Sequence, residues 1–242
     1  IELWCSCAFG HMRALSTARS YHLAIASRTF VPVFVTASPT SIGVQALMDA
    51  IVSLMPSPAE AGAVTVVKPD GSEDTIEASD AGPLVTYVWK TTADPFVGKL
   101  TYLRVYSGVL NADSRVWNYT KDTEERLGTL YVMRGKDQEA VTTLHAGDIG
   151  TVAKLAETST GDSMGDKGKG LIIPMPAYPN ALYSAAVTPK TQADSTKISP
   201  TLTRLSEEDP TLSWHQESST NQTILQGMGD QHIDVAIRKA ES

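Results

Sequence analysis

Two glycines and a histidine stand between a strand-like run and an amphipathic segment in the stretch ILQGMGDQHIDVAIRKA, residues 224–240. A strand, a glycine turn and a helix are the layout of a phosphate-binding site, and a histidine nearby is a common general base. The dinucleotide-binding pattern also needs a third glycine and an acidic partner for the ribose, and this stretch has neither. We therefore interpret Gly227 and Gly229 as a tight strand-to-helix turn, with Asp230 capping the helix and His232 at its start.

A second glycine-rich stretch, TGDSMGDKGKG at 160–170, is the other candidate for phosphate chemistry. A P-loop needs the pattern G-x-x-x-x-G-K-[ST], because backbone amides and one lysine must surround the phosphates. Gly165 and Gly170 have the required spacing, but Leu171 follows them where the lysine is needed. The stretch is therefore interpreted as a glycine-rich hairpin, and the chain alone is predicted not to hold a nucleoside triphosphate.

The remaining reactive side chains do not form a recognisable catalytic or metal-binding set. Cys5 and Cys7 are the only two cysteines, and with His11 they still lack the fourth ligand of a structural zinc site. The histidines have no partner at a telling interval, which predicts no catalytic residue. They are His11, His22, His145, His215 and His232.

The largest carboxylate cluster is Glu207, Glu208 and Asp209, just before Pro210. It falls at the expected C-terminal end of a helix, where negative charge opposes the helix dipole. This misfit indicates that the acids meet a partner or cap a neighbouring group.

Composition and charge exclude several classes of protein. The 242 residues are 42% hydrophobic and 19% charged, with a net charge of −7, which argues against a nucleic-acid binder held by a basic surface. The middle of the chain, 91–190, is neutral, so any RNA contact is expected there, and no DNA binding is expected. No apolar run reaches the length of a membrane helix and no signal peptide is visible, which predicts a cytoplasmic protein with no membrane partner.

The first part of the chain has the pattern of the end of an α/β domain. Residues 1–30 are expected to be mostly helical, and the valine-rich run VPVFVTAS at 31–38 is expected to be a buried strand. Apolar residues at helical spacing predict a helix over 44–55, which the prolines at 56 and 58 stop. The polar stretch 59–83 is interpreted as a linker or a long loop.

Two further domains are expected after the linker. Short runs rich in β-branched and aromatic residues, separated by Gly, Asp and Asn, predict a small β-barrel over 84–176. From 177 to 242 the expected order is β-α-β-β-α, a split βαβ (ferredoxin-like) domain without its last strand. The fold class is thus mainly β plus α+β, with a short α/β remnant at the N-terminus.

Four stretches, in this order, resemble the translational GTPase elongation factor G. VPVFVTASPTSIGVQALMDAIVSLMPSP at 31–58 is similar to the end of its GTPase domain, and DPFVGKLTYLRVYSGVL at 94–110 to the opening of its second domain. HAGDIGTVAKLAETSTGDSM at 145–164 is similar to the later part of that domain. The segments within 189–235 that contain EEDPTL and QGMGDQHIDV resemble its third domain.

The resemblance implies a fragment made of the end of the GTPase domain (1–58, with 1–30 unplaced), domain II (84–176) and most of domain III (177–242). The parent protein is then expected to be a GTPase that binds GTP and Mg²⁺ and promotes tRNA–mRNA translocation on the ribosome. In this fragment neither GTP nor Mg²⁺ is expected, because the P-loop and switch motifs are absent from it. Its expected partners are small-subunit rRNA and proteins and, indirectly, the tRNA–mRNA complex.

Three groups of residues carry these expectations. Thr36, Ala37 and Ser38 replace the family's Gly-Ser-Ala, the segment that approaches the guanine base. The domain-III motif comprises Glu208, Asp209, Pro210, Gly227, Gly229 and His232. Candidates for ribosome contact in the barrel are Arg104, Arg115, Arg126, Arg134 and Lys136.

Two alternatives share the same architecture. One is another GTPase of the group, either a tetracycline-resistance ribosomal protection protein or a release-factor-recycling GTPase. The other is a paralogue that binds the ribosome without hydrolysing GTP.

Overall fold

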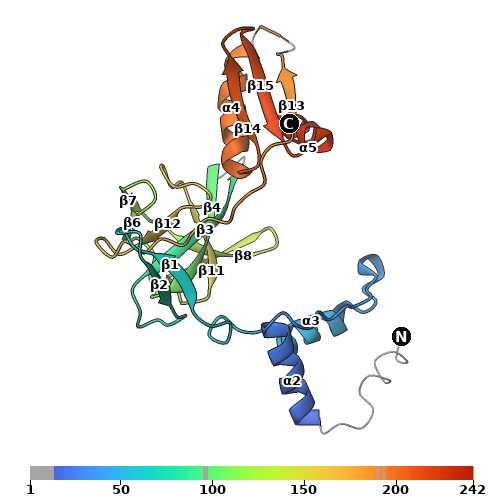
Figure 1. The fold of residues 1–242 in the computed structure, drawn as a ribbon, viewed down its shortest axis with the longest axis vertical. Coiled ribbons are helices and arrows are strands. Elements are labelled where there is room, and N and C mark those ends of the chain that lie inside the picture. The colour runs from blue at the N-terminus through green and yellow to red at the C-terminus, as the bar shows by residue number, and fades with distance from the viewer. Residues whose placement is uncertain (1–13, 95–97, 190, 193, 242) are drawn as a thin grey trace. The chain divides into compact units, whose positions relative to one another are not determined.

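The computed structural model describes residues 14–94, 98–189, 191, 192 and 194–241, and the chain divides into two units, Ile1–Gly62 and Ala63–Ser242 (Figure 1). Cys5, Cys7 and His11, with the zinc question they raise, lie outside the described residues. Of the helices in the described part of the chain, none is long and apolar enough to cross a membrane.

The first unit contains helix α2 (Ala14–Ala26), a short 3₁₀ turn η1 (Ser38–Thr40) and helix α3 (Val44–Leu54). The helix predicted over 44–55 is thereby confirmed. The buried strand predicted over 31–38 is wrong: Val33 and Val35 are 86% and 92% exposed. A strand needs a neighbouring strand to take up its backbone N–H and C=O groups, and in the described part of this unit only the isolated Ala37–Ile42 bridge provides such pairing.

The second unit begins with a hairpin where a linker was expected. Strands β1 (Val64–Val67) and β2 (Glu73–Ile76) pair in antiparallel register. Val66 and Ile76 are buried in a small cluster that includes Tyr87. The expectation of a linker or loop over all of 59–83 is therefore wrong for residues 64–76. The strand-like segment VTVV at 64–67 was missed because it is short and is surrounded by Gly, Ala and acidic residues, which are typical of loops.

Ten strands of the second unit follow as a β-barrel. The main sheet has eight antiparallel strands in the order β7-β6-β12-β3-β4-β11-β8-β9, and β5 pairs separately with β10. The bounds are β3 Val85–Asp94, β4 Gly98–Ser107, β5 Leu110–Asn111, β6 Arg115–Asn118, β7 Thr123–Arg126, β8 Leu130–Arg134, β9 Asp137–Val141, β10 Thr143–Leu144, β11 Ile149–Ala153 and β12 Ser163–Gly165.

A single apolar core fills this barrel. Leu103, Leu110, Leu130 and Val152 are among its members and are fully buried. They come from strands far apart in the sequence, so removal of their apolar surface from water holds these strands around one core. The predicted barrel is confirmed.

The last part of the second unit is a three-stranded antiparallel sheet with two helices. Its elements are β13 (Tyr183–Val187), α4 (Ser195–Glu208), β14 (Ser213–Glu217), β15 (Gln222–Gly227) and α5 (Asp230–Glu241), and the strand order is β13-β15-β14. Leu202 and Leu205 of α4 pack with Leu225 of β15 and Ile233 of α5 in a core of their own. The predicted β-α-β-β-α order is confirmed.

Candidate functional site

The C-terminal end of α4 meets the barrel through two threonine hydroxyls. Thr91 Oγ1 of β3 lies 2.7 Å from the backbone carbonyl oxygen of Glu207, and Thr160 Oγ1 lies 3.2 Å from the same oxygen. The last four carbonyls of a helix have no partner inside the helix. Here the barrel satisfies one of them, so the end of α4 is capped by another domain.

The acidic side chains at the end of α4 reinforce this contact. Glu208 Oε1 accepts the backbone N–H of Ala93 at 2.8 Å, and Glu207 Oε2 accepts from Lys99 Nζ at 3.2 Å. The partner expected for the carboxylate cluster is thus the β3–β4 hairpin of the same chain. The contact explains why the acids stand at a helix end where the dipole alone disfavours them.

The loop that contains Thr160 is fixed to the barrel by a network of buried polar side chains. Asp162 and Glu125 are 3% and 6% exposed. Glu125 Oε1 accepts the N–H and the hydroxyl of Thr158, and Asp162 Oδ2 accepts from Asn118 Nδ2 at 2.9 Å. Because the carboxylates are satisfied by several donors, the network fixes the loop in one place. Thr160 is therefore presented to α4 by a rigid support.

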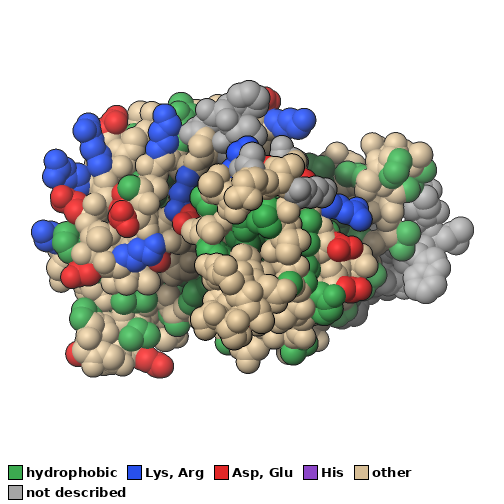
Figure 2. All heavy atoms as spheres, turned by 90° about the horizontal axis from the view of Figure 1, so that it is seen from above, with side chains coloured by type: hydrophobic (Ala, Val, Ile, Leu, Met, Phe, Trp, Pro, Cys, Tyr) green, Lys and Arg blue, Asp and Glu red, His purple; other side chains and the backbone are tan. Residues whose placement is uncertain are grey.

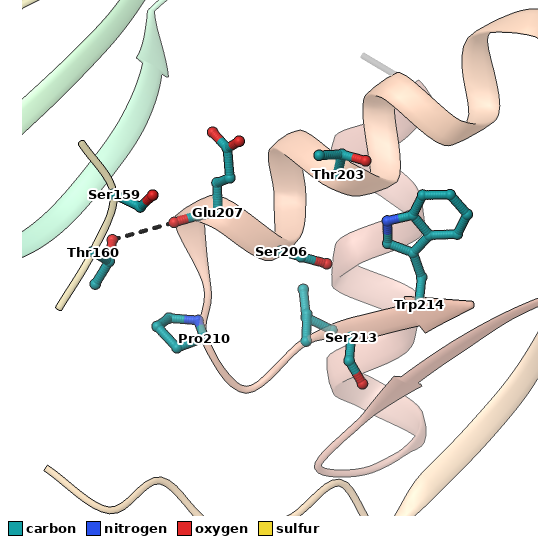
Figure 3. A pocket seen from close by; sticks show the side chains of 9 residues that line it. Ser159, Thr160, Thr203, Ser206, Glu207, Pro210, Ser213 and Trp214 are labelled. Carbon is teal, nitrogen blue, oxygen red and sulfur yellow. Dashed lines mark hydrogen bonds between the residues drawn. The ribbon is translucent and has the colours of Figure 1, made fainter. Parts of the chain in front are cut away.

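A pocket of about 410 Å³ lies beside this contact (Figure 3). Its walls come from the Ser159–Thr160 loop on one side and from α4 and β14 on the other. Figure 3 shows the Thr160 hydroxyl directed at the Glu207 carbonyl, and Trp214 standing apart at the far side. Five of its nine lining residues carry a hydroxyl, the others include Pro210 and Leu212, and the lining holds no nucleophile–base pair. The pocket is thus a gap at a domain junction rather than a catalytic site.

The domain-III motif is brought together on the other side of the same turn. His232 Nε2 lies 3.0 Å from Asp209 Oδ2, and the backbone N–H of Met228 donates to His232 Nδ1 at 3.1 Å. Because Nδ1 accepts, the neutral ring carries its proton on Nε2 and donates it to Asp209. Asp209 also accepts from the backbone N–H and the hydroxyl of Thr211. The ring therefore joins the turn after α4 to the turn before α5.

This arrangement changes the acidity of Asp209. Burial opposes ionisation, but the Thr211 hydroxyl, the Thr211 N–H and His232 together outweigh it, so the pKa of Asp209 lies below its usual value. The carboxylate is thus charged at neutral pH and serves as an acceptor in a structural junction.

Gly227 and Gly229 have different roles in the strand-to-helix turn. A Cβ on Gly227 would lie 3.0 Å from His232 Nδ1 and 3.0 Å from Ile233 Cδ1, whereas a Cβ on Gly229 would meet nothing within 4 Å. Gly227 is therefore needed for the close approach of the imidazole. The phosphate turn considered from the sequence is a structural corner.

Models of two domains of one family match the chain. Elongation factor G domain 2 matches residues 83–167, and elongation factor G domain III matches residues 178–242. Together the two matches cover more than half of the chain. The chain belongs to the elongation factor G family.

A solved structure agrees with this assignment. A crystal structure of a protein from Thermus thermophilus superposes on the chain with a TM-score of 0.74 and 26% sequence identity. The match covers 96% of this chain and 32% of that one, so the chain spans about a third of the length of its structural relative. The barrel is thus the domain 2 of an elongation factor G family member, and residues 178–242 are its domain III.

Two stretches of the chain were considered from the sequence for nucleotide contact, 160–170 and 36–38. The stretch 160–170 runs through β12 into a loop in which Gly170 packs against Pro69, and no helix begins there to receive a phosphate. Thr36, Ala37 and Ser38 form an exposed turn beside the Ala37–Ile42 bridge. These residues do not fit GTP or Mg²⁺ by themselves, and no step of GTP hydrolysis is assigned to them.

Of the barrel residues that are expected to contact the ribosome, Arg115 and Arg126 lie opposite each other, and the others are dispersed. Arg134 and Lys136 are exposed at the β8–β9 turn, and Arg104 lies over the Tyr106 ring at 4.9 Å. Arg115 and Arg126 stand directly opposite each other in the β6–β7 register. Figure 2 shows lysines and arginines interspersed with acidic side chains on the face it presents, so that face is mixed in charge.

The junction residues Thr91, Thr160 and Lys99 were not predicted from the sequence. A threonine within a strand and a threonine within a polar loop carry no pattern of their own. The one signal was the carboxylate cluster at the end of α4, which indicated a partner without identifying it.

Proposed function

We propose that this elongation factor G family member is part of a translational GTPase that acts on the ribosome in the cytoplasm and promotes movement of the tRNA–mRNA complex. Within it, the barrel docks on the small subunit, and domain III relays the nucleotide state toward the tRNA. GTP and Mg²⁺ are held by the full-length parent, outside this fragment.

The observation that supports the proposal is the capped end of α4. A relay needs an element of domain III that is bound to the barrel, so that a conformational change in one domain alters the position of the other. The Glu207 carbonyl, held by Thr91 and Thr160, is such an element. The supporting loop is fixed by buried carboxylates, which makes the contact stiff on the barrel side.

The test is a translocation assay with the full-length parent and purified ribosomes. We expect ribosome-stimulated GTP hydrolysis and single-round translocation, and we expect the chain of residues 1–242 to co-sediment with the small subunit. Hydrolysis without translocation would favour a ribosomal protection or release-factor GTPase. Binding without hydrolysis would favour the non-hydrolysing paralogue and would overturn the proposal.

A further inference from the structure

A methionine side chain covers the backbone of the barrel loop that contacts α4. Gly161 follows Thr160 in this loop and has a φ of 94°, a left-handed conformation that glycine adopts readily. A glycine has no side chain to shield its own backbone, yet Gly161 is buried. A Cβ built on Gly161 would lie 2.7 Å from Met175 Sδ and 3.2 Å from Met175 Cε. The thioether therefore lies directly against this glycine.

The same side chain is open to water and stands on a stiff piece of backbone. Met175 is 46% exposed, so small solutes reach its sulfur. Pro174 and Pro176 flank it: each proline ring fixes its own φ, and Pro176 also restricts Met175 to extended conformations. Met175 thus combines an accessible sulfur with a fixed place on the loop.

The residues that Met175 covers adjoin the contact with domain III. Thr160 Oγ1 lies 3.2 Å from the backbone carbonyl oxygen of Glu207, at the end of α4. The next residue, Gly161, donates its backbone N–H to the Val88 carbonyl oxygen of β3 at 2.8 Å. A chemical change at the sulfur therefore acts one residue away from the hydroxyl that contacts α4.

We propose that Met175 is an oxidation site, at which hydrogen peroxide converts the thioether to a sulfoxide and thereby loosens the contact between the barrel and α4. The O–O bond of the peroxide breaks and an S–O bond forms. The sulfur is oxidised by two electrons, and the peroxide is reduced to water. The sulfoxide is polar, and its oxygen has no room between the sulfur and Gly161. The oxidised side chain therefore turns toward water, uncovers Gly161 and lets the loop open more often.

The test is hydrogen exchange of the chain before and after treatment with hydrogen peroxide, with oxidation of each methionine followed by mass spectrometry. We expect oxidation at Met175 to make exchange in the 158–162 loop and in the last turn of α4 faster by about twofold to tenfold. Methionine sulfoxide reductases A and B with a thiol should restore the original rates, whereas the thiol alone should not. Met175→Gln places a polar amide at the same position and should reproduce the faster exchange without peroxide.

Met175→Leu is the matched control, because leucine keeps the apolar volume and cannot be oxidised at this position. Its exchange should resemble that of the untreated wild type and should not respond to peroxide. Met48→Leu with Met55→Leu removes two other exposed methionines and should leave the response to peroxide as it is in the wild type.

Two results would overturn the proposal. A peroxide response that persists in Met175→Leu would assign the effect to another residue. Unchanged exchange in the wild type after full oxidation of Met175 would show that the sulfur does not influence the contact with α4. None of these measurements uses the ribosome, so their outcome is independent of the proposed function.

Discussion

The imidazole of His232 and the carboxylate of Asp209 lie 3.0 Å apart, although 23 positions separate them in the chain. One belongs to the first turn of α5 and the other to the turn that ends α4. Since Asp209 directly follows the α4 residues that contact the barrel, the pair connects the interior of domain III to the domain junction. The histidine thus acts in the architecture of the domain rather than in chemistry.

Replacement of His232 by alanine is expected to destabilise domain III. The change leaves the Met228 N–H and one Asp209 oxygen without their partner, which costs about 1–2 kcal/mol in the free energy of unfolding. Urea denaturation followed by circular dichroism measures this loss. His215→Ala, at an exposed position of β14, is the control and is expected to change stability by less than about 0.5 kcal/mol. Equal effects of the two changes would contradict a special role for His232.

Acid is expected to weaken the same junction through Asp209. Its pKa is lower in the folded chain than its ordinary value, so ionised Asp209 stabilises the fold at pH values above about 4. That contribution is lost as the pH falls from there through the lowered pKa of the folded state. Asp209→Asn should therefore be less stable than the wild type at neutral pH and should lose less stability between about pH 4 and pH 2. Parallel stability curves for the two proteins would refute this account.

The two glycines of the strand-to-helix turn are expected to respond differently to alanine. Gly227→Ala pushes a methyl group against His232 Nδ1 and Leu212 Cδ2, at 3.0 and 3.2 Å, and is expected to cost about 1–3 kcal/mol. Gly229→Ala points into open space and should change stability by less than about 0.5 kcal/mol. Thermal unfolding of both variants measures the difference. A larger loss for Gly229→Ala would show that the turn has another conformation.

The chain by itself is expected neither to bind nor to hydrolyse GTP. The glycine-rich stretch 160–170 is a strand and a loop packed on Pro69, which leaves no ring of free backbone amides at the start of a helix. Calorimetric titration with GTP and Mg²⁺ is expected to show no heat of binding. Micromolar affinity would contradict the expectation and would point to the Thr36–Ser38 segment.

The fold was largely predictable because its elements have strong local signals. The apolar spacing of α4 and α5, the turn at 227–229 and the alternating strands of the barrel each depend on neighbours close in sequence. The buried strand predicted over 31–38 was wrong, because an apolar run is buried only where another part of the protein packs against it. The β1–β2 hairpin was missed because its burial depends on distant residues. Val66 is buried in a cluster with Tyr87 and Ile173, and the sequence around Val66 does not reveal these contacts.

The candidate site was predictable only in part. Asp209, Pro210, Gly227 and His232 were grouped by resemblance, and the structure adds the hydrogen bond between His232 and Asp209 and the close approach of Gly227 to the imidazole. Their contact with the barrel depends on Thr91, 116 positions before Glu207, and a single threonine hydroxyl carries no signal over such a distance. The opposition of Arg115 and Arg126 likewise depends on strand register, which a sequence alone does not fix.

Removal of the two hydroxyls that cap α4 is expected to loosen the junction without unfolding either domain. Thr91→Val with Thr160→Val keeps the side-chain shape but leaves the Glu207 carbonyl with no donor from either hydroxyl. Hydrogen exchange in the last turn of α4 should become faster by about five- to thirtyfold, because a lost buried bond of about 1–2 kcal/mol lowers the opening free energy by that amount. Exchange in β15, inside the separate core of domain III, should not change.

Thr129→Val is the control for this experiment, because Thr129 is exposed in the barrel and lies outside the junction. Faster exchange throughout domain III would mean that the hydroxyls support the whole domain, whereas unchanged exchange in α4 would mean that Glu208 and Lys99 hold the junction alone. The same double variant in the full-length parent tests the effect on translocation and on ribosome binding. If the capped helix end carries the relay, translocation should slow while ribosome binding stays the same, since the barrel residues expected to contact the ribosome, such as Arg134 and Lys136, are unchanged.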